Sequence, residues 1–593
     1  MRIGLLTDGG YPYATGESRL WCDRLVRGLA SHTFDIYALS RSARQEERGW
    51  IQLPRQVGQV RTASLWVPDR DGRAYGRRER RRFAARLGEL VSAVCTTVHA
   101  DGEHVDGGHI DGGHLGGRYA DHTAAFAEGL YGLADLAREH GGLCAALRSE
   151  TAVRILESAC RAPGTHSGAH AAAVPDYLAF ADHLERALRP LSLDWYGPRT
   201  LAAADLCHAT SGGPAALPGL LAKRFFGVPL LVTEYGVQLR AHYLATAGAP
   251  GDGFTGAGAP PLTPPVRTLL AGLQRRLAAE VYRQAAVITP GNSHARRWQE
   301  RCGADPARLR TVYPGMETAR FAGVDEDAGA ADTLVWVGRI EPTKDLVSLL
   351  HAFAAIRRAR PEARLRIIGT PAQGAEAVTY LAHCRALAAQ LFPDEAADAH
   401  AVGENPVSFE DIGDPEAPEL PDAYGAGSVV VLSSTVEGFP VSLVEAMFCG
   451  RATVSTDVGA VVEIVGGTGL VVPPRNPRAL ADACVALLSD PGRRERLGAA
   501  ARARALELFS VEQNVAAFRS IYLELVSHAP VHRPADGLGA DGAPLPFAHP
   551  AEASVRGRWT GVHRPAPQRH TPSWAKNTAL PAGTRGGPGE SDV

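Results

Sequence analysis

The segment Val335–Asp345 carries two cations where a phosphate could bind. Its sequence, Val-Trp-Val-Gly-Arg-Ile-Glu-Pro-Thr-Lys-Asp, is typical of a strand that ends at Gly338 and a short loop that opens a helix. A strand-to-helix turn directs backbone N–H groups and the positive end of the helix dipole toward a ligand beyond the strand. Arg339 can grip a diphosphate through two N–H groups, and Lys344 adds a point charge. The two cations could stabilise a departing nucleoside diphosphate, although loop cations are equally typical of a solvated surface.

Two carboxylates form the second candidate group. In Glu437-Gly-Phe-Pro-Val-Ser-Leu-Val-Glu445 the first acid lies in a loop and the second on the helix that follows. Pro440 suits the first turn of that helix, and Gly438 permits close approach of a ligand to the backbone. We expect Glu437 beside a transferred sugar and Glu445 as an acceptor for ribose hydroxyls. The alternative is that Glu445 is a solvent-facing residue of an amphipathic helix.

Short aliphatic runs alternate with amphipathic helical patterns in two successive series. This alternation predicts parallel sheets covered by helices, and hence an α/β protein. In the first half we expect a helix over Glu17–Ala30 and strands at Arg2–Thr7, Phe34–Ala38, Asp205–Ala209, Val228–Thr233 and Ala286–Thr289. In the second half we expect strands at Thr333–Val337, Arg364–Ile368, Ser428–Leu432 and Ala452–Ser455. The Gly-rich turn Asp8–Gly16 after the first strand is a further, weaker candidate for contact with a ligand.

The two series define the expected domains. Residues 1–317 form an N-terminal Rossmann-like domain on the acceptor side, 318–528 form a C-terminal nucleotide-sugar-binding domain, and 529–593 form a disordered Pro/Gly-rich tail. A polar, aperiodic stretch near the boundary, 325–332, supports the division. A low-complexity loop at about 100–120 contains His104, His109 and His114 at five-residue spacing. Imidazoles can bind zinc, but this spacing fixes no tetrahedral geometry, so a surface loop is the favoured interpretation.

Composition excludes several function classes. The 593 residues include 62 basic and 64 acidic side chains, so a net charge of −2 provides no general field for nucleic acid or an anionic membrane. The nine cysteines are scattered without a C-x-x-C pair, which favours a reducing compartment. Neither a signal-peptide pattern nor a long apolar run is found, and a cytoplasmic protein is expected.

The C-terminal motifs resemble those of the family-4 retaining glycosyltransferases of GT-B fold, in which two Rossmann-like domains face each other across a cleft. The resemblance covers about 333–510 and is carried by G-R-x-x-P-x-K-D at 338–345, E-G-F-P-x-x-x-x-E at 437–445 and the segment from Thr456 through Glu463 to Pro474. It implies that the diphosphate is bound by Arg339 and Lys344, that Glu437 lies near the sugar and that Glu445 binds the ribose. It also implies donor contacts from Gly338, Gly438, Phe439, Pro440, Gly459 and Ala460. A terminal helix at 511–526 is expected to pack back on the first domain.

The N-terminal half resembles the PelF-type branch, bacterial enzymes linked to exopolysaccharide assembly. The similarity rests on the Tyr-Pro-Tyr turn that ends at Gly16, on Trp21, and on the segments Asp205–Gly212 and Thr233–Arg240, with poor matching across 70–200. It implies that Gly16 contacts the donor. It makes His208 the leading catalytic imidazole, with a satisfied core histidine as the equal alternative.

The same resemblance suggests acceptor-side roles for Glu234, Tyr235 and Arg240. Three positions depart from the branch pattern. Glu17 replaces a glycine and could repel donor phosphates, Tyr235 replaces a histidine, and Pro314 replaces an asparagine.

These observations lead to a hypothesis of hexose transfer with retention, from a nucleoside diphosphate sugar such as UDP-glucose to a glycan or small-molecule acceptor. Arg339, Lys344 and helix dipoles would stabilise the leaving group, so neither a metal nor another cofactor is expected. We expect peripheral association with a membrane polysaccharide-synthesis complex. We expect no nucleic-acid partner. Two alternatives stay open: a sugar-nucleotide epimerase, and a non-catalytic sugar-nucleotide-binding assembly subunit.

Overall fold

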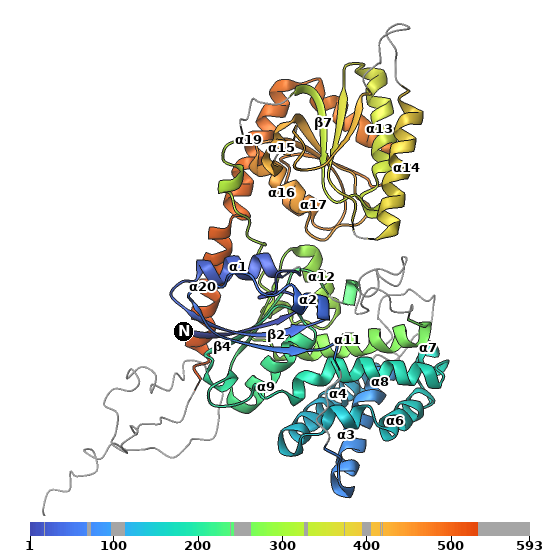
Figure 1. Ribbon diagram of the computed structural model, residues 1–593, viewed down its shortest axis with the longest axis vertical. Helices are drawn as coiled ribbons and strands as arrows, with labels where there is room; N and C mark the ends of the chain where they lie inside the picture. The colour runs from blue at the N-terminus through green and yellow to red at the C-terminus, as the bar shows by residue number, and fades with distance from the viewer. Residues whose placement is uncertain are drawn as a thin grey trace, which may run out of the picture. The chain divides into compact units, whose positions relative to one another are not determined.

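The alternating patterns fold into two parallel sheets of six strands each (Figure 1). The computed structural model describes residues 1–16, 18–67, 73–96, 113–237, 239–241, 262–324, 330–372, 374–393, 405–415, 417 and 419–531. Residues Met1–Val531 form one compact unit. All paired strands in both sheets run parallel, which confirms the expected α/β class.

The first sheet has the order β3-β2-β1-β4-β5-β6. Its strands are β1 (Arg2–Asp8), β2 (Thr33–Ser40), β3 (Val57–Ser64), β4 (Leu206–Ala209), β5 (Leu230–Glu234) and β6 (Val287–Pro290). The order reverses next to β1, so the carboxyl ends of β1 and β4 form a switch point, the usual ligand position in such sheets.

The second sheet has the order β12-β11-β10-β7-β8-β9. Its strands are β7 (Ala330–Val337), β8 (Arg364–Ile368), β9 (Val407–Glu410), β10 (Gly427–Leu432), β11 (Ala452–Thr456) and β12 (Leu470–Val472). Here β7, β10 and β11 are direct neighbours. The loops that follow these three strands therefore leave the same edge of the sheet.

Each sheet is buried on both faces, as near-continuous apolar strands require. In the second sheet, Leu334 and Trp336 face a cluster with α13, α14 and α18, whereas Val335 and Val337 face a cluster with α16, α17 and α19. Figure 1 shows α13 and α14 on one side of this sheet and α16 and α17 on the other. The helices of this half are α13 (Leu346–Ala359), α14 (Ala375–Leu391), α15 (Leu420–Gly425), α16 (Val441–Phe448), α17 (Val461–Val465), α18 (Pro477–Leu488) and α19 (Pro491–Leu508).

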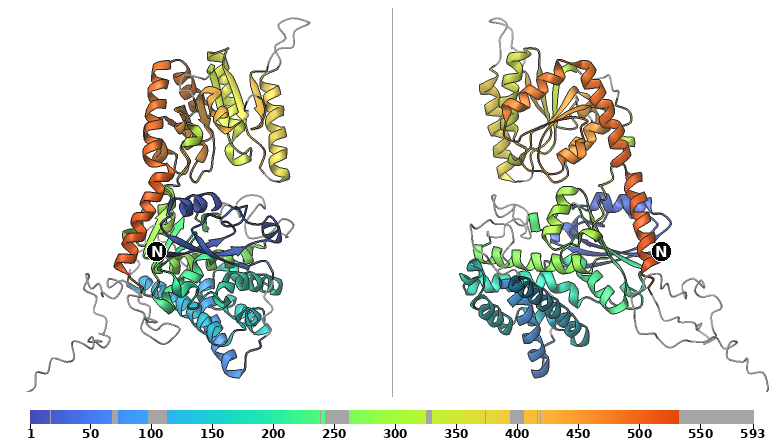
Figure 2. Two further views of the ribbon diagram at one scale, coloured as in Figure 1. Left: turned by 60° about the vertical axis from the view of Figure 1, so that its left-hand side comes forward. Right: turned by 180° about the vertical axis from the view of Figure 1, so that it is seen from behind.

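The first sheet is covered on one face by α1 (Arg19–Gly28) and by α20 (Val511–His528). Phe518 and Tyr522 of α20 are fully buried against Ile3 and Leu5 of β1. The last helix, red in Figure 2, lies beside this sheet. This contact confirms the expectation that the terminal helix packs back on the first domain.

A helical segment between β3 and β4 covers part of the other face, and the sequence did not predict it. It contains α3 (Arg77–Cys95), α4 (Gly113–His140), α5 (Leu143–Leu147), α6 (Glu150–Cys160), α7 (Ser167–His170) and α8 (Val174–Leu188). The other helices of this half are α2 (Ala43–Glu47), α9 (Leu217–Phe226), α11 (Pro264–Gln284) and α12 (Ser293–Arg301). Helices of both groups share one apolar cluster with the sheet.

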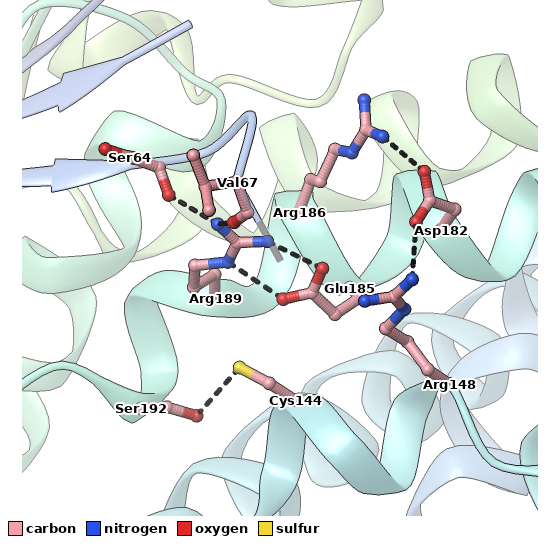
Figure 3. A network of polar contacts seen from close by, with 9 residues as sticks. All are labelled: Ser64, Val67, Cys144, Arg148, Asp182, Glu185, Arg186, Arg189 and Ser192. Atoms are coloured by element: carbon pink, nitrogen blue, oxygen red, sulfur yellow. Dashed lines mark hydrogen bonds and ion pairs between the residues drawn. The ribbon is translucent and has the colours of Figure 1, made fainter. Parts of the chain in front are cut away.

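A buried ion pair fixes α8 to the end of β3 (Figure 3). The guanidinium of Arg189, just after α8, donates to both carboxylate oxygens of Glu185 at 2.8 and 2.7 Å, and the two side chains are 4% and 1% exposed. The same guanidinium also donates to the carbonyls of Ser64 and Val67. The sheet and the helical segment therefore share one fully satisfied charge network.

Several of the predictions concern residues that the structure does not describe. Glu17, His104 and His109 lie outside the described residues, as do the side chain of His114 and the tail from 532 onward. All nine cysteines are buried and free of disulfides. Within the described part of the chain, none of the helices combines the length and apolar character needed to cross a bilayer.

Candidate functional site

Three loops meet at the carboxyl edge of the second sheet. The loop after β10 is tied to the loop after β7, because Thr435 N–H donates to the carbonyl of Thr343 at 2.8 Å. On its other side, the Ala460 N–H after β11 donates to the Gly438 carbonyl at 3.1 Å. The loops that contain the predicted donor-binding motifs therefore form one continuous surface.

Lys344 and Glu437 are in direct contact on this surface. Lys344 Nζ lies 2.5 Å from Glu437 Oε1, and the side chains are only 20% and 9% exposed. Ser434 Oγ donates to the same carboxylate oxygen at 2.7 Å, and Ser433 Oγ donates to the carbonyl of Lys344 at 2.8 Å. The partial burial strengthens the attraction between the two charges. The structure thus brings together one cation and one acid that the sequence placed in separate motifs.

Asp345 explains how the lysine is held. It has a left-handed backbone, φ 48°, and its side chain accepts a hydrogen bond from Ser348 N–H at 3.2 Å as the N-cap of α13. Asp tolerates this conformation better than most residues because its short side chain bonds locally. The 3-10 turn Pro342–Lys344 and the cap together set the direction in which the Lys344 side chain leaves the loop.

Gly459 and Gly438 both lie on this surface, but close packing requires a glycine only at Gly459. Gly459 has φ 60°, and a Cβ there would lie 2.4 Å from the Glu437 carbonyl oxygen. The glycine is therefore needed for close packing of two loops. A Cβ on Gly438 would meet no atom within 4 Å. Its position leaves open space at the Glu437 loop, and the predicted ligand contact at Gly438 stays a prediction.

Phe439 and Pro440 position the loop. The Phe439 ring packs edge-on against Phe509 with centroids 5.8 Å apart, and Pro440 is the buried N-cap of α16. Phe439 is therefore part of the apolar support beneath the loop. Both residues hold Glu437 and Gly438 at the edge of the sheet.

Glu445 lies one turn into α16 and is half-buried. Its Oε2 accepts a hydrogen bond from Tyr424 OH at 2.7 Å, and its Oε1 makes no hydrogen bond with the described residues. Burial raises the pKa of Glu445, whereas the Tyr424 hydroxyl and the charges of Arg320 and Arg24 act in the opposite direction. One oxygen is thus fixed and the other can accept a hydroxyl. Tyr424, Arg320 and Arg24 were not among the predicted site residues.

Arg339 directly follows Gly338 at the end of β7 and is exposed. It forms no ion pair with the residues that the structure describes, in contrast to Lys344. Because Glu445 lies on the helix after the neighbouring strand β10, the two residues belong to the same edge of the sheet. Arg339 therefore adds an exposed positive charge to the edge of the sheet at which Lys344 and Glu437 meet.

Gly16 closes the Gly-rich turn after β1. It has φ 118°, and a Cβ there would lie 2.1 Å from the Gly9 carbonyl oxygen, so the turn folds tightly on itself. Asp8 at the start of the turn is gripped through both oxygens by Arg41, at 2.7 and 2.9 Å. The turn is therefore closely packed and anchored by an ion pair at the carboxyl end of its strand.

The acceptor-side candidates have different surroundings. Glu234 is 2% exposed and accepts a hydrogen bond from Tyr282 OH, so it belongs to the core. Tyr235 packs against Trp21, with centroids 5.2 Å apart, and its hydroxyl accepts from the Asn514 side chain at 3.1 Å. Arg240 donates to the backbone carbonyl of Glu437 at 3.0 Å. Of the three, Arg240 is the residue that contacts the Glu437 loop.

His208 is fully buried in β4. Its Nδ1 lies 2.7 Å from Tyr522 OH, its Nε2 lies 2.6 Å from Thr233 Oγ1, and burial lowers its pKa to about 3. An imidazole with both nitrogens engaged and no exposed surface has the surroundings of a satisfied core histidine. The geometry therefore favours the interpretation of His208 as a core histidine over a catalytic role.

Glu463 has a role that its motif did not reveal. Its carboxylate accepts from Ser293 N–H at 2.7 Å and from Tyr313 OH at 2.8 Å. A carboxylate at the first turn of α12 is favoured by the helix dipole. Glu463 thereby connects α17 of the second half to α12 of the first.

Comparisons with known families divide the chain into two parts. Residues 1–307 match the family described as Domain of unknown function (DUF3492). Residues 331–490 match the family described as Glycosyl transferases group 1. The second match contains all three loops of the candidate site.

Among curated relatives, the D-inositol 3-phosphate glycosyltransferase of Streptomyces bingchenggensis is 33% identical over 236 residues, 37% of this chain and 49% of the relative. The protein of that name from Rhodococcus erythropolis is 31% identical over 315 residues, 50% of this chain and 62% of the relative. The chain spans about half to three fifths of the length of these relatives.

The crystal structure of Anabaena Alr3699/HepE in complex with UDP superimposes with a TM-score of 0.50 at 14% identity. The alignment covers 88% of this chain and all of that one. At this identity the likeness concerns the fold, and it confirms the expected GT-B architecture of two Rossmann-like sheets.

Proposed function

We propose that this chain, which belongs to the DUF3492 family, is a glycosyltransferase that moves a hexose from a nucleoside diphosphate sugar to an acceptor hydroxyl. The group 1 glycosyl transferase match over 331–490 and the activity named for the curated relatives support this reaction. The observation that carries the proposal is the half-buried contact between Lys344 and Glu437 at the carboxyl edge of a parallel sheet. Ligands of open α/β sheets bind at this edge.

The leaving group sets the first chemical requirement. In the proposed reaction the bond from hexose C1 to the diphosphate oxygen breaks as the acceptor oxygen bonds to C1, and the acceptor proton passes to the departing phosphate. Negative charge grows on the diphosphate, and Arg339 and Lys344 stabilise it more in the transition state than in the ground state. Lys344 is already 20% exposed, so it can turn toward a phosphate without unfolding its loop. Glu437 then faces the sugar hydroxyls.

The nucleoside is held further along the same surface in this proposal. Glu445 offers its unengaged oxygen to a ribose hydroxyl, while Tyr424 fixes the other oxygen at 2.7 Å. A carboxylate whose rotamer is locked by a neighbour loses less entropy when it binds a ligand. The closely packed turn at Gly16 and the open space at Gly438 support donor contacts from the backbone.

The finer assignments rest on resemblance. A UDP-sugar such as UDP-glucose is the proposed donor, supported by the UDP complex of the Anabaena protein, and retention follows from the family-4 motifs. The exopolysaccharide role and association with a membrane polysaccharide-synthesis complex rest on the PelF-type segments near Gly16 and Arg240. A cytoplasmic location is part of the proposal because nine buried cysteines without a disulfide bond are typical of a reducing compartment.

Turnover of purified full-length chain with a panel of UDP-, GDP- and ADP-sugars tests the proposal. Release of the nucleoside diphosphate and a mass-identified glycosylated product are expected for at least one donor. Lys344→Met and Glu437→Gln should each lower the rate by about 100-fold. Undiminished rates in both variants would refute the assignment. An epimerised donor formed without an acceptor would identify an epimerase, and nucleotide binding without turnover would identify a non-catalytic subunit.

A further inference from the structure

A pocket on one face of α12 has no role in the proposed donor site. It has a volume of about 190 Å³ and is lined by His294, Arg297, Trp298 and Arg301. These residues are spaced by three, one and three positions, so they share one stripe of the helix surface. The opposite face of α12 is buried through Ala295 and Gln299.

The pocket is positively charged, because two arginines line it and lack acidic partners among the residues that the structure describes. Neither Arg297 nor Arg301 forms an ion pair with a carboxylate in the described part of the chain. Arg297 Nε donates to a backbone carbonyl in its own helix at 3.4 Å, and the Arg301 guanidinium lies 5.8 Å from the Trp298 ring centroid. By contrast, Arg296 on the same helix is neutralised by Glu300 at 3.0 Å. An anion entering the pocket would thus meet two uncompensated guanidinium groups.

His294 adds a polar atom to the same place. Its Nε2 is buried and has no hydrogen-bond partner in the described ranges of the chain. Burial lowers the pKa of His294, and the charges of Arg240, Arg297 and Arg301 lower it further. The His294 ring therefore lies within the positive field of three arginines and lines the pocket as a neutral imidazole.

The N-terminus of α12 is already occupied and does not form the pocket. Asn292 caps the Ala295 N–H at 2.7 Å, and Glu463 accepts from the Ser293 N–H at 2.7 Å. The pocket residues therefore act through their side chains. Arg240 interacts with both the pocket and the donor surface. Its positive charge lowers the pKa of His294, and its guanidinium donates a hydrogen bond to the Glu437 carbonyl at 3.0 Å.

We propose that the α12 pocket binds an anionic group, a phosphate or a carboxylate, of the sugar acceptor, with the acceptor ring against Trp298. This inference rests on the proposed glycosyl transfer and names its acceptor class. The donor diphosphate already has Arg339 and Lys344 on the second sheet, so the charges on α12 serve a different anion. Binding there directs the remainder of the acceptor toward the Glu437 loop through the neighbouring Arg240.

Three acceptors of similar size distinguish the ligand chemistry: glucose, glucose 6-phosphate and glucuronate. With the donor that the wild type turns over, we expect a lower KM for at least one anionic acceptor than for glucose. Arg297→Gln/Arg301→Gln should raise that KM at least tenfold and leave the glucose KM and donor hydrolysis unchanged. Arg296→Gln is the matched control, because it removes a paired charge from the same helix and should change no acceptor KM. Equal losses with glucose and with the anions would overturn the proposal.

Direct binding separates this inference from the proposed function. In calorimetry with UDP present, the wild type should bind the preferred anion, and the double variant should bind it at least tenfold more weakly. Preference for glucose 6-phosphate identifies a phosphate group, and preference for glucuronate a carboxylate. If UDP binds and the donor turns over but neither anion binds, the pocket assignment fails while the proposed function stands. If no donor turns over, the proposed function fails and the acceptor role of the pocket fails with it.

Discussion

Lys344 and Glu437, 93 positions apart in the chain, meet at 2.5 Å where two neighbouring strands of the second sheet end. Ser434 donates to the same carboxylate oxygen, so the acid is held whether or not the lysine moves. The contact joins the charge that would face the diphosphate to the acid that would face the sugar. The two residues should therefore act as one unit.

A double-mutant cycle on turnover tests this coupling. Lys344→Met and Glu437→Gln should each reduce kcat/KM by about 100-fold, and the double variant should be little worse than either, because residues that act together are not additive. Arg366 and Glu410 are the matched control, since they form another half-buried pair of the same sheet, 20% and 11% exposed. Arg366→Met should leave turnover per folded molecule unchanged. Strictly additive losses at 344 and 437 would show that the two residues act independently.

Gly459 and Gly438 provide a paired test of the loop. Gly459→Ala should cost about 1–3 kcal/mol of local strain and lower turnover at least tenfold, because its φ is 60° and its Cβ would overlap the Glu437 carbonyl. Gly438→Ala should leave the unfolding midpoint unchanged, since its Cβ would meet nothing, but it should raise the donor KM. Urea unfolding and donor kinetics on both variants check this. A Gly459→Ala protein with wild-type turnover would contradict the packing argument.

The buried pair of Arg189 and Glu185 should dominate the attachment of the helical segment. Arg189→Met leaves Glu185 with an uncompensated charge at 1% exposure, and a loss of about 3–5 kcal/mol in unfolding free energy is expected. Arg189→Met/Glu185→Leu should recover part of that loss because it removes both charges. Arg154→Met, from a pair with Glu150 that is 74% and 79% exposed, should change stability by less than about 1 kcal/mol. Equal effects at 189 and 154 in urea unfolding would refute the assignment.

His208 predicts a pH dependence of stability. Its pKa is about 3 in the folded protein and near 6.5 when exposed, so between these values the unfolded chain binds the additional proton. Stability should therefore fall as pH drops below about 6.5, by up to about 1.4 kcal/mol per pH unit from this residue. His208→Gln should reduce that slope between pH 7 and 5 in urea unfolding. An identical slope in the variant would mean that His208 is not held neutral.

Local sequence patterns were sufficient to predict most of the two sheets. Buried parallel strands such as β1 and β10 are continuous apolar runs, and the helix after β7 repeats its apolar residues every three or four positions. Three strands were not predicted: β3, β9 and β12. Each lies at the edge of its sheet and is only partly buried, so it lacks the continuous apolar run of a buried strand. The helical segment after β3 was missed because it interrupts the strand series.

The candidate site was predictable where a motif is local and not where partners are distant. Arg339, Lys344, Glu437 and Glu445 follow from strand ends and spacing. The burial of His208 depends on Tyr522, 314 positions away, so no local pattern could distinguish a core imidazole from a catalytic one. The contact of Arg240 with the Glu437 loop likewise spans 197 positions.

Calorimetric titration of UDP into the full-length protein tests the central claim most directly, because it requires no knowledge of the sugar or the acceptor. The wild type should bind UDP, Lys344→Met and Glu445→Gln should each weaken binding at least tenfold, and Arg366→Met should match the wild type. Absence of binding to the wild type, or equal affinity in all four proteins, would contradict a nucleotide-sugar site at the edge of the second sheet.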